Sequence, residues 1–218
     1  MSGLFITGTD TDVGKTVVTA CIAAAFRARG RAPTAVKPLA TGSSAPGSDA
    51  ETIAAAAGHA PKVFACFPEP ASPERAARQA GIEVDDEGFL NWMLAQHGDP
   101  LLVEGVGGWA VPLTHSMTVE DLALRLQLPV IIVAANRLGV INHALLTAEA
   151  IRECGLTLAG VVINNGTTTP HPLQDWNAED LRRWLGPATP AAMVGRVESG
   201  FDAEVGESIL QALGLSSV

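Results

Sequence analysis

The stretch that most constrains the fold runs from Gly8 to Thr16 and reads Gly-Thr-Asp-Thr-Asp-Val-Gly-Lys-Thr. A short apolar run, 4–6, precedes it, and an alanine- and valine-rich run, 17–29, follows it. A strand, a glycine-bounded loop ending in Gly-Lys-Thr and a helix are the context of a phosphate-binding loop. Glycine lets successive N–H groups face one anion, and the helix N-terminus adds its positive end. The stretch predicts a nucleoside triphosphate site; the alternative is a glycine-rich turn with a surface lysine.

Two side chains of this loop have defined roles in such a site. Lys15 is expected to reach the outer phosphates, and the hydroxyl of Thr16 is expected to ligate Mg²⁺. The loop departs from the common form, because six residue steps rather than five separate Gly8 from Gly14.

Composition narrows the class of protein. With 218 residues, 47% hydrophobic and 17% charged, the chain is expected to form one domain over residues 1–218 with a large core. A net charge of −9 disfavours partners such as nucleic acid or an anionic membrane. The three cysteines lack the spacing of a metal knuckle or a disulfide framework. The first residues lead directly into a strand, and no apolar stretch is long enough to span a membrane, which favours a cytoplasmic location.

Apolar runs alternate with helical sequence along the chain. Strands are expected at 4–6, 35–36, 101–103, 130–133 and 158–163, and helices at 16–29, 49–57, 86–96, 119–126, 142–153, 178–185 and 203–213. The longer apolar runs do not alternate with polar residues, as expected of parallel strands covered on both faces. The pattern predicts a doubly wound, mainly parallel α/β sheet of the phosphate-loop type, with helices on both faces and ligands at the carboxyl ends of the strands. The segment 67–81, rich in Pro, Glu and Arg, is the least regular part.

Three charged residues follow expected strands or open a helix. Lys37 ends a buried strand, where it either snorkels to the surface or is aimed at a transferring phosphate. Glu104 ends the third strand, at a position that suits a carboxylate holding Mg²⁺ or an ordinary strand-end cap. Asp49 opens a helix, and the sequence does not decide between an N-cap and a metal ligand.

Two later segments are also candidates for binding. Gly139 and Asn142 precede an expected helix and form either an anion-receptive helix start or a plain capped helix. Asn164 ends the fifth strand, and its amide offers the donor and acceptor that an adenine edge needs. The next two residues, Asn165 and Gly166, are typical of a turn.

Together the motifs resemble the dethiobiotin synthetase family. Five segments carry the resemblance: Gly-Thr-Asp-Thr-Asp-Val-Gly-Lys-Thr (8–16), Lys-Pro-Leu-Ala-Thr-Gly (37–42), Val-Glu-Gly-Val-Gly-Gly-Trp-Ala-Val-Pro-Leu (103–113), Leu-Gly-Val-Ile-Asn-His-Ala (138–144) and Leu-Thr-Leu-Ala-Gly-Val-Val-Ile-Asn (156–164). They occur in family order over about three-quarters of the chain. The resemblance implies a homodimer that uses ATP, Mg²⁺ and CO₂ to close a ring on 7,8-diaminopelargonate. The reaction would pass through a carbamate and a carbamic–phosphoric anhydride.

The resemblance also implies roles by position. Catalytic roles fall to two lysines and two threonines: Lys15, Lys37, Thr11 and Thr41. The nucleotide is held by Asp12, Val13, Gly14, Lys15, Thr16, Val17, Glu104 and Asn164, and Mg²⁺ by Thr16, Asp49 and Glu104. The diamine lies near Thr41 and Gly107, and its far carboxylate at Gly139, Val140, Ile141 and Asn142 of the partner subunit.

The chain departs from the family pattern at three places. Thr41 stands where serine is familiar, Glu74 where histidine is frequent, and 196–198 lacks the proline-bearing pattern beside the adenine. A second class, the nucleotide-driven partition and septum-site ATPases, carries a signature lysine directly after the first glycine of the loop, where this chain has Thr9. A glutamine-dependent amidoligase would need a glutaminase domain for which the chain has no room.

Overall fold

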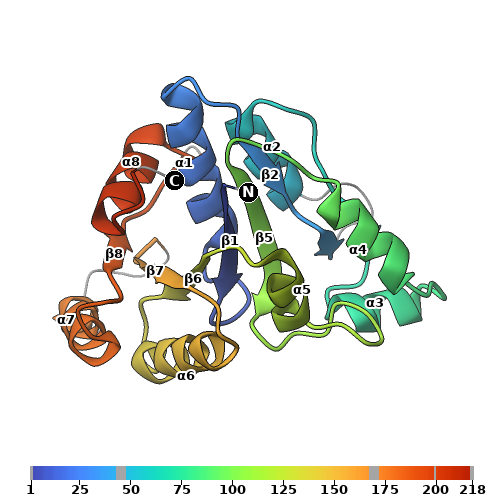
Figure 1. Ribbon diagram of the computed structural model, residues 1–218. Coiled ribbons are helices and arrows are strands. Elements are labelled where there is room, and N and C mark those ends of the chain that lie inside the picture. Colours follow the sequence, from blue (N-terminus) through green and yellow to red (C-terminus); the bar gives the residue numbers. More distant parts are fainter. Residues whose placement is uncertain (1, 43–47, 167–171, 199, 217–218) are drawn as a thin grey trace.

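A parallel β-sheet forms the centre of the computed structural model, which describes residues 2–42, 48–166, 172–198 and 200–216. Within these residues six strands are hydrogen-bonded in the order β2-β5-β1-β6-β7-β8, and every pair is parallel (Figure 1). They are β1 (Gly3–Gly8), β2 (Thr34–Val36), β5 (Leu101–Gly108), β6 (Val130–Ala135), β7 (Leu158–Asn164) and β8 (Ala191–Val194). The chain leaves β1 for β2 on one side and reaches β6 on the other, so the strand order reverses beside β1. Doubly wound sheets bind ligands at such a point.

Helices cover both faces of this sheet. They are α1 (Lys15–Ala28), α2 (Ser48–Ala57), α3 (Pro73–Gln79), α4 (Asp86–Leu94), α5 (Val119–Leu126), α6 (Val140–Glu153), α7 (Pro172–Leu185) and α8 (Ala203–Ala212). On one face α1 packs between α2 and α8, and on the other α6 packs beside α7 (Figure 1). Within the described residues, none of these helices is long and apolar enough to cross a membrane.

The two faces bury separate hydrophobic clusters. Successive side chains of β1 illustrate the division, because Leu4 and Ile6 belong to the cluster with α1, α2 and α8, whereas Phe5 belongs to the cluster with α3 to α7. Alternate side chains of a strand point to opposite faces of its sheet. The continuous apolar runs of the sequence therefore reflect burial on both sides, as expected for parallel strands.

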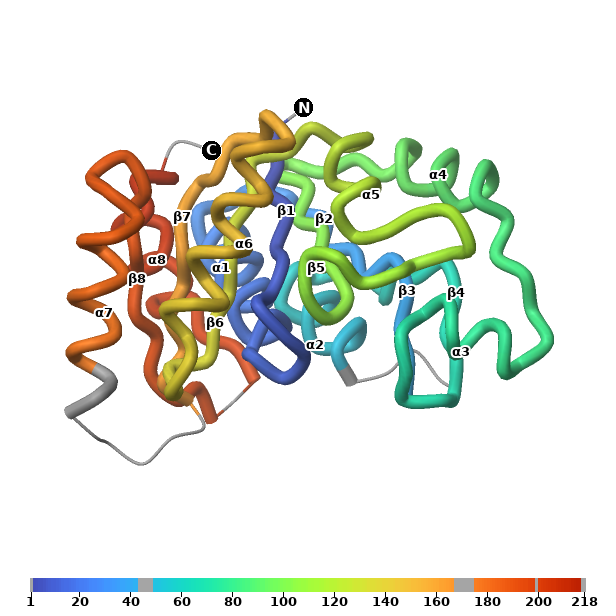
Figure 2. The backbone as a smooth tube through the Cα atoms, turned by 90° about the horizontal axis from the view of Figure 1, so that it is seen from below, coloured from blue at the N-terminus to red at the C-terminus, as the bar shows by residue number. Residues whose placement is uncertain are grey.

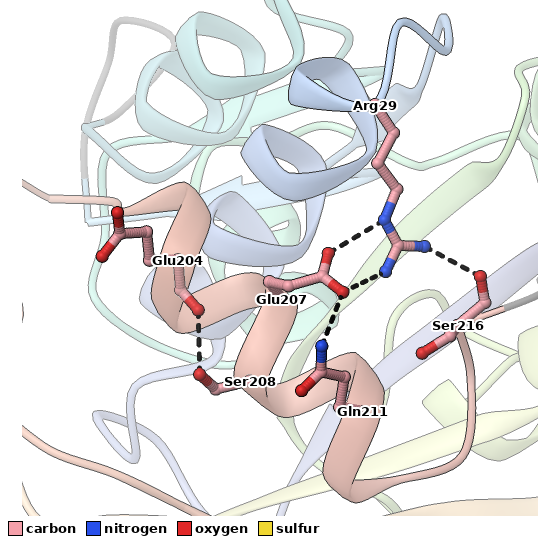
Figure 3. A network of polar contacts seen from close by, with 6 residues as sticks. All are labelled: Arg29, Glu204, Glu207, Ser208, Gln211 and Ser216. Carbon is pink, nitrogen blue, oxygen red and sulfur yellow. Dashed lines mark hydrogen bonds and ion pairs between the residues drawn. The ribbon is translucent and has the colours of Figure 1, made fainter.

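Two smaller features complete the fold. A separate parallel pair, β3 (Leu39–Thr41) and β4 (Ala65–Phe67), lies with α3 at the opposite end of the molecule from α7 (Figure 2). Arg29, the C-cap residue of α1, forms a two-pronged ion pair with Glu207 of α8. It also donates to the carbonyl oxygen of Ser216 over 2.9 Å (Figure 3). This network fixes the C-terminal end of α1 to α8 and to the segment that follows it.

The doubly wound parallel fold is confirmed, as are the expected strands and helices, with shifted ends. Helix α6 begins at Val140 rather than at residue 142, because Gly139, with φ 94°, already serves as its N-cap. Strands β3, β4 and β8 and helix α3 were not predicted from the sequence. Helix α3 lies inside the segment 67–81, which was expected to be irregular. Its first residue is Pro73, and the Ser72 side chain caps it by accepting a hydrogen bond from Arg75 N.

Candidate active site

The loop between β1 and α1 has the backbone shape of an anion cradle. Gly14 has φ 95° and Asp12 has φ 55°, so the chain turns through left-handed conformations just before α1. A Cβ built on Gly8 would lie 2.8 Å from the carbonyl oxygen of Asp10 and 2.9 Å from Lys15 Nζ, which leaves room there for glycine alone. The lysine that begins α1 is thus folded back over the loop, where phosphate groups bind in proteins of this architecture.

Lys15 is held as a buried cation with no carboxylate bound to it in the described structure. Its Nζ donates to the carbonyl oxygen of Asp10 over 2.9 Å, and the residue is 6% exposed. Burial, together with the charge of Lys37, lowers the pKa of Lys15 to about 8. An incoming polyanion would favour the charged form of this side chain.

The register of two strands brings Lys37 beside Glu104. Strand β2 pairs with β5 so that Val36 lies opposite Val103, and the next residues of the two strands are Lys37 and Glu104. Their side chains meet at 2.6 Å between Nζ and Oε1, and both are buried. The pairing is what makes these charges tolerable inside the fold, because an unpaired buried charge is costly.

Two further side chains join this pair. Asp49 Oδ2 lies 3.3 Å from Lys37 Nζ, and Thr16 Oγ1 donates to Glu104 Oε1 over 2.9 Å. Burial lowers the pKa of Lys37, but the carboxylates of Glu104 and Asp49 outweigh it, and the net pKa is raised. Lys37 is therefore a charged, buried lysine rather than one that snorkels to the surface. Asp49 is the second residue of α2, and its side chain reaches Lys37.

The donor set fits a magnesium ion. Glu104 Oε2 is buried and has no hydrogen-bond partner among the described residues, so one carboxylate oxygen is free to bind a cation. The Thr16 hydroxyl contacts Glu104, and the Asp49 carboxylate contacts the lysine paired with it, so both groups lie nearby. Mg²⁺ typically takes one or two protein carboxylates and completes its shell with phosphate and water. No group of three or more His, Cys, Asp or Glu side chains forms a metal cluster in the described part of the chain.

A cleft of about 990 Å³ opens over these residues. The predicted site residues that line it are Thr11, Asp12, Gly14, Lys15, Thr16, Val17, Lys37, Thr41, Asp49, Glu104 and Gly107. Gly107 has φ 62°, and a Cβ there would lie 2.9 Å from Val111 Cγ2, so the backbone wall at this point is open only to glycine. The cleft is also lined by 70–72, which was not among the predicted site residues; the local signal in the sequence is the pair Ser72-Pro73.

Asn164 lies against the loop rather than in the cleft lining. Its Nδ2 donates to the carbonyl oxygen of Val13 over 3.0 Å, and its Oδ1 accepts from Gly166 N over 2.8 Å. The amide also lies directly against Gly14, since a Cβ built there would be 2.0 Å from Asn164 Nδ2. Asn164 thus braces the loop in this structure, and its contact with adenine stays a prediction.

The segment from Gly139 to Asn142 is not part of the cleft lining of its own chain. Asn142 is exposed on the first turn of α6, and Leu138 just before the segment is 85% exposed.

Glu74, where the family often has histidine, pairs instead with Arg78 on the same helix over 3.5 Å. It lines a separate cavity of about 320 Å³ with His115 rather than the cleft.

One connection near the loop was missed from the sequence. Arg137, which follows β6, lies 2.9 Å from Asp10 Oδ2 through its Nη2. The two residues are brought together because β6 pairs with β1, Gly8 lying opposite Val133. No local pattern signals this contact, since the residues are far apart in the sequence.

The parallel sheet, the glycine-bounded loop and the two lysines of the cleft, Lys15 and Lys37, define a phosphate-loop nucleotide-binding protein. Solved structures share this fold: a putative plasmid partition protein of Borrelia burgdorferi bound to AMPPNP has a TM-score of 0.59 at 12% identity, with 100% of this chain and 99% of that chain covered. The cell division ATPase MinD of Pyrococcus furiosus has a TM-score of 0.51 at 14% identity, covering 99% and 98%. At these identities the likeness concerns the fold alone.

Sequence comparisons identify the family. Residues 2–202 match the family model described as an AAA domain. A curated ATP-dependent dethiobiotin synthetase of an Anaeromyxobacter species is 42% identical over 194 residues, covering 85% of this chain and 86% of the relative. Another, of Ralstonia nicotianae, is 41% identical over 193 residues, covering 83% of each. This chain therefore belongs to the family of ATP-dependent dethiobiotin synthetases.

Proposed function

We propose that this enzyme carboxylates 7,8-diaminopelargonate with CO₂ and closes the ureido ring of dethiobiotin, converting ATP to ADP and phosphate. One observation carries the proposal. Lys15 and Lys37 line the same cleft, and their charges are close enough for Lys37 to lower the pKa of Lys15. Two cations facing one space suit the transfer of a phosphoryl group, in which catalysis is mainly positioning and charge stabilisation.

The reaction has three covalent steps. One amine nitrogen of the substrate attacks CO₂ and loses a proton, which gives a carbamate. A carbamate oxygen then attacks the γ-phosphorus of ATP, ADP leaves, and a carbamic–phosphoric anhydride forms. The second amine attacks the carbonyl carbon, loses a proton and expels phosphate. The protein needs no nucleophile of its own for this sequence.

The side chains of the cleft divide this work. Lys15 neutralises the outer phosphates, and Lys37 stabilises the carbamate and the phosphoryl group in transfer. Thr11 and Thr41 line the region where the carbamate meets the phosphate. Gly107 allows the diamine to approach the backbone closely. Holding both reactants in line is a proximity effect that is worth several powers of ten in rate.

Magnesium supplies charge neutralisation on the phosphates when it is bound. Thr16, Asp49 and Glu104 would hold it, with the free Oε2 of Glu104 as the strongest sign of a cation position. The rest of its shell would come from the triphosphate and water, as is usual for this ion.

The far carboxylate of the diamine is assigned to Gly139, Val140, Ile141 and Asn142 of the partner subunit in a homodimer. Backbone N–H groups at a helix start attract a carboxylate. The exposure of Leu138 and Leu146 beside this segment supports a contact surface there. The fixed distance from this anchor to the cleft would select diamines of one length.

Product mass spectrometry tests the proposal directly. The purified protein is incubated with ATP, Mg²⁺, bicarbonate and diaminopelargonate, and the product is expected to carry one added carbonyl in place of two hydrogens. Omission of any one component is the control and should abolish the product. ATP hydrolysis that proceeds equally without the diamine, with no such product, would overturn the assignment and favour a nucleotide-driven switch.

A further inference from the structure

Lys37 occupies the place between the two carboxylates of the metal site. Its Nζ lies 2.6 Å from Glu104 Oε1, 3.3 Å from Asp49 Oδ2 and 3.4 Å from the carbonyl oxygen of Gly105. Glu104 and Asp49 are also the two carboxylates that fit Mg²⁺. The ammonium group and the ion are therefore cations with the same ligands.

The two cations compete for these ligand atoms, because Lys37 already contacts one oxygen of each carboxylate. Mg²⁺ needs oxygen atoms at about 2.0–2.1 Å and near-octahedral geometry. Glu104 Oε1 already accepts from Lys37 Nζ and from Thr16 Oγ1, so this carboxylate oxygen is engaged before a metal arrives. Only Oε2 of this carboxylate stays without a partner among the described residues.

Charge acts in the same direction. With Lys37 in place, Glu104 and Asp49 present one net negative charge to a metal instead of two. Lys15 adds a second positive charge to the same cleft. A free divalent ion is thus weakly attracted, whereas an ion that arrives with a triphosphate brings its own negative charge.

We infer that Lys37 is the resident counter-cation of the metal site: it excludes free divalent ions from the empty enzyme and yields its place only to a metal that enters with the triphosphate. The inference rests on the proposed function in taking a metal–triphosphate as the natural ligand. Release from Glu104 and Asp49 frees the ammonium group to turn toward the phosphates. Lys37 thereby makes metal entry and its own arrival at the reacting atoms one coupled event.

Binding of free Mn²⁺, followed by electron paramagnetic resonance without nucleotide, tests this directly. Lys37→Met is expected to bind Mn²⁺ at least about tenfold more tightly than the wild type. Lys15→Met removes a charge from the same cleft without removing a competitor, so its gain should be smaller. Lys62→Met is the matched control; the carbonyl oxygen of this half-buried lysine accepts from Lys37 N, but its side chain contacts Gln96 over 3.3 Å and does not line the cleft, so its loss should change nothing.

Equal Mn²⁺ affinity of wild type and Lys37→Met would overturn the inference, and so would equal gains in Lys37→Met and Lys15→Met. Lys37→Met leaves Glu104 buried without its partner, so the variant is less stable than the wild type. Thermal melting of the wild type gives an answer that needs no variant. Mn²⁺ alone should leave the melting temperature unchanged, and Mn²⁺ with a non-hydrolysable ATP analogue should raise it. A rise with Mn²⁺ alone would contradict the inference.

These measurements contain neither the diamine nor bicarbonate. Failure to form dethiobiotin would therefore leave the Mn²⁺ result standing. Conversely, tight binding of free Mn²⁺ to the wild type would remove the counter-cation role without touching the proposed reaction.

Discussion

Asp10 and Arg137 are joined by a hydrogen bond of 2.9 Å between Oδ2 and Nη2, which ties the phosphate-binding loop to the segment leading into α6. Asp10 has further contacts: its Oδ1 accepts from Thr11 N over 2.8 Å and from Thr11 Oγ1 over 3.4 Å, and its carbonyl oxygen accepts from Lys15 Nζ. The hydrogen bond from Thr11 N outweighs the effect of burial and, with a smaller contribution from the charge of Arg137, holds the pKa of Asp10 below its usual value. One residue thus organises the start of the loop.

Arg137→Ala is expected to affect nucleotide binding more than stability. Both partners of this ion pair are about half exposed, so the free energy of unfolding should change by less than about 1 kcal/mol. The loop loses a restraint, and the Kd for Mg-ATP measured by calorimetry should rise a few-fold. Arg183→Ala, which breaks an exposed pair with Asp180, is the control and should leave the Kd unchanged. Identical Kd values for the two variants would show that Arg137 does not position the loop.

Lys37→Ala should retain ATP binding and lose most turnover. Removing a charge that stabilises the transition state typically lowers kcat by about 10²–10³. Steady-state kinetics and calorimetry separate the two effects. Lys62→Ala is the matched control and should behave like the wild type. Turnover of Lys37→Ala within a few-fold of the wild type would remove the catalytic role of this lysine.

The lowered pKa of Lys15 predicts that the protein takes up protons when Mg-ATP binds. Its pKa is lowered to about 8 in the empty protein, so at about pH 8 roughly half of the molecules lack this proton, and the phosphates restore it. Calorimetry in two buffers of different ionisation enthalpy should show an uptake of about half a proton at that pH. The uptake should grow toward about pH 9 and vanish below about pH 6.5.

Lys15→Arg supplies the control, because arginine stays charged throughout this range. The variant should show the same binding heat in both buffers, and a wild type that does so too would refute the prediction.

The lowered pKa of Lys15 also makes the free energy of unfolding depend on pH. Between about pH 8 and the ordinary lysine value of 10.5 the unfolded chain holds the proton at Lys15 more tightly, so this residue makes stability rise with pH in that window.

Asn142→Trp should weaken diamine binding by about tenfold or more and leave ATP binding within a few-fold. A bulky ring at the first turn of α6 would block the approach of the substrate carboxylate, and a hydrogen bond to a charged group is worth about 1.5–3 kcal/mol. Glu149→Trp, on an exposed position of the same helix, is the matched control. The KM for the diamine and the Kd for ATP are compared. An unchanged KM would remove the carboxylate site from this segment.

Gly206→Ala tests the packing of α8 on α1. A Cβ there would lie 2.0 Å from the carbonyl oxygen of Cys21, so the helices must move apart. Overpacking of this kind costs about 1–3 kcal/mol, which exceeds the gain of up to about 1 kcal/mol in helix propensity. Gly195→Ala is the control, because no described atom lies within 4 Å of a methyl group built there. Denaturant unfolding should separate the two variants, and equal stabilities would show that the helices yield freely.

Much of the fold, and the part of the cleft around the loop, Lys37 and Glu104, was predictable from local sequence. The positions of the glycines predict the conformation of the loop from Gly8 to Thr16, and the apolar runs predict buried parallel strands. Lys37 was selected because a charge at the end of a buried strand needs a partner, and Glu104 because a carboxylate at a strand end suits Mg²⁺. The structure shows that each is the partner of the other, which follows from the register of β2 on β5.

Other features depend on information that no short stretch contains. Strands β3 and β4 have three residues each, too few to show a periodic pattern. Helix α3 has seven residues and begins in a proline-rich stretch that reads as a loop. The contact of Asp10 with Arg137 requires β6 to lie beside β1, and strand order is a property of the whole sheet.

The clamp on Arg29 has a mechanical consequence. Helix α1 starts at Lys15 and is held at its far end, through Arg29, by Glu207 and by the carbonyl oxygen of Ser216. A pull on the backbone at residue 216 would therefore reach α1 through this guanidinium group as well as through α8 along the chain. A tether or fusion partner joined there would load the helix that begins at Lys15 together with α8.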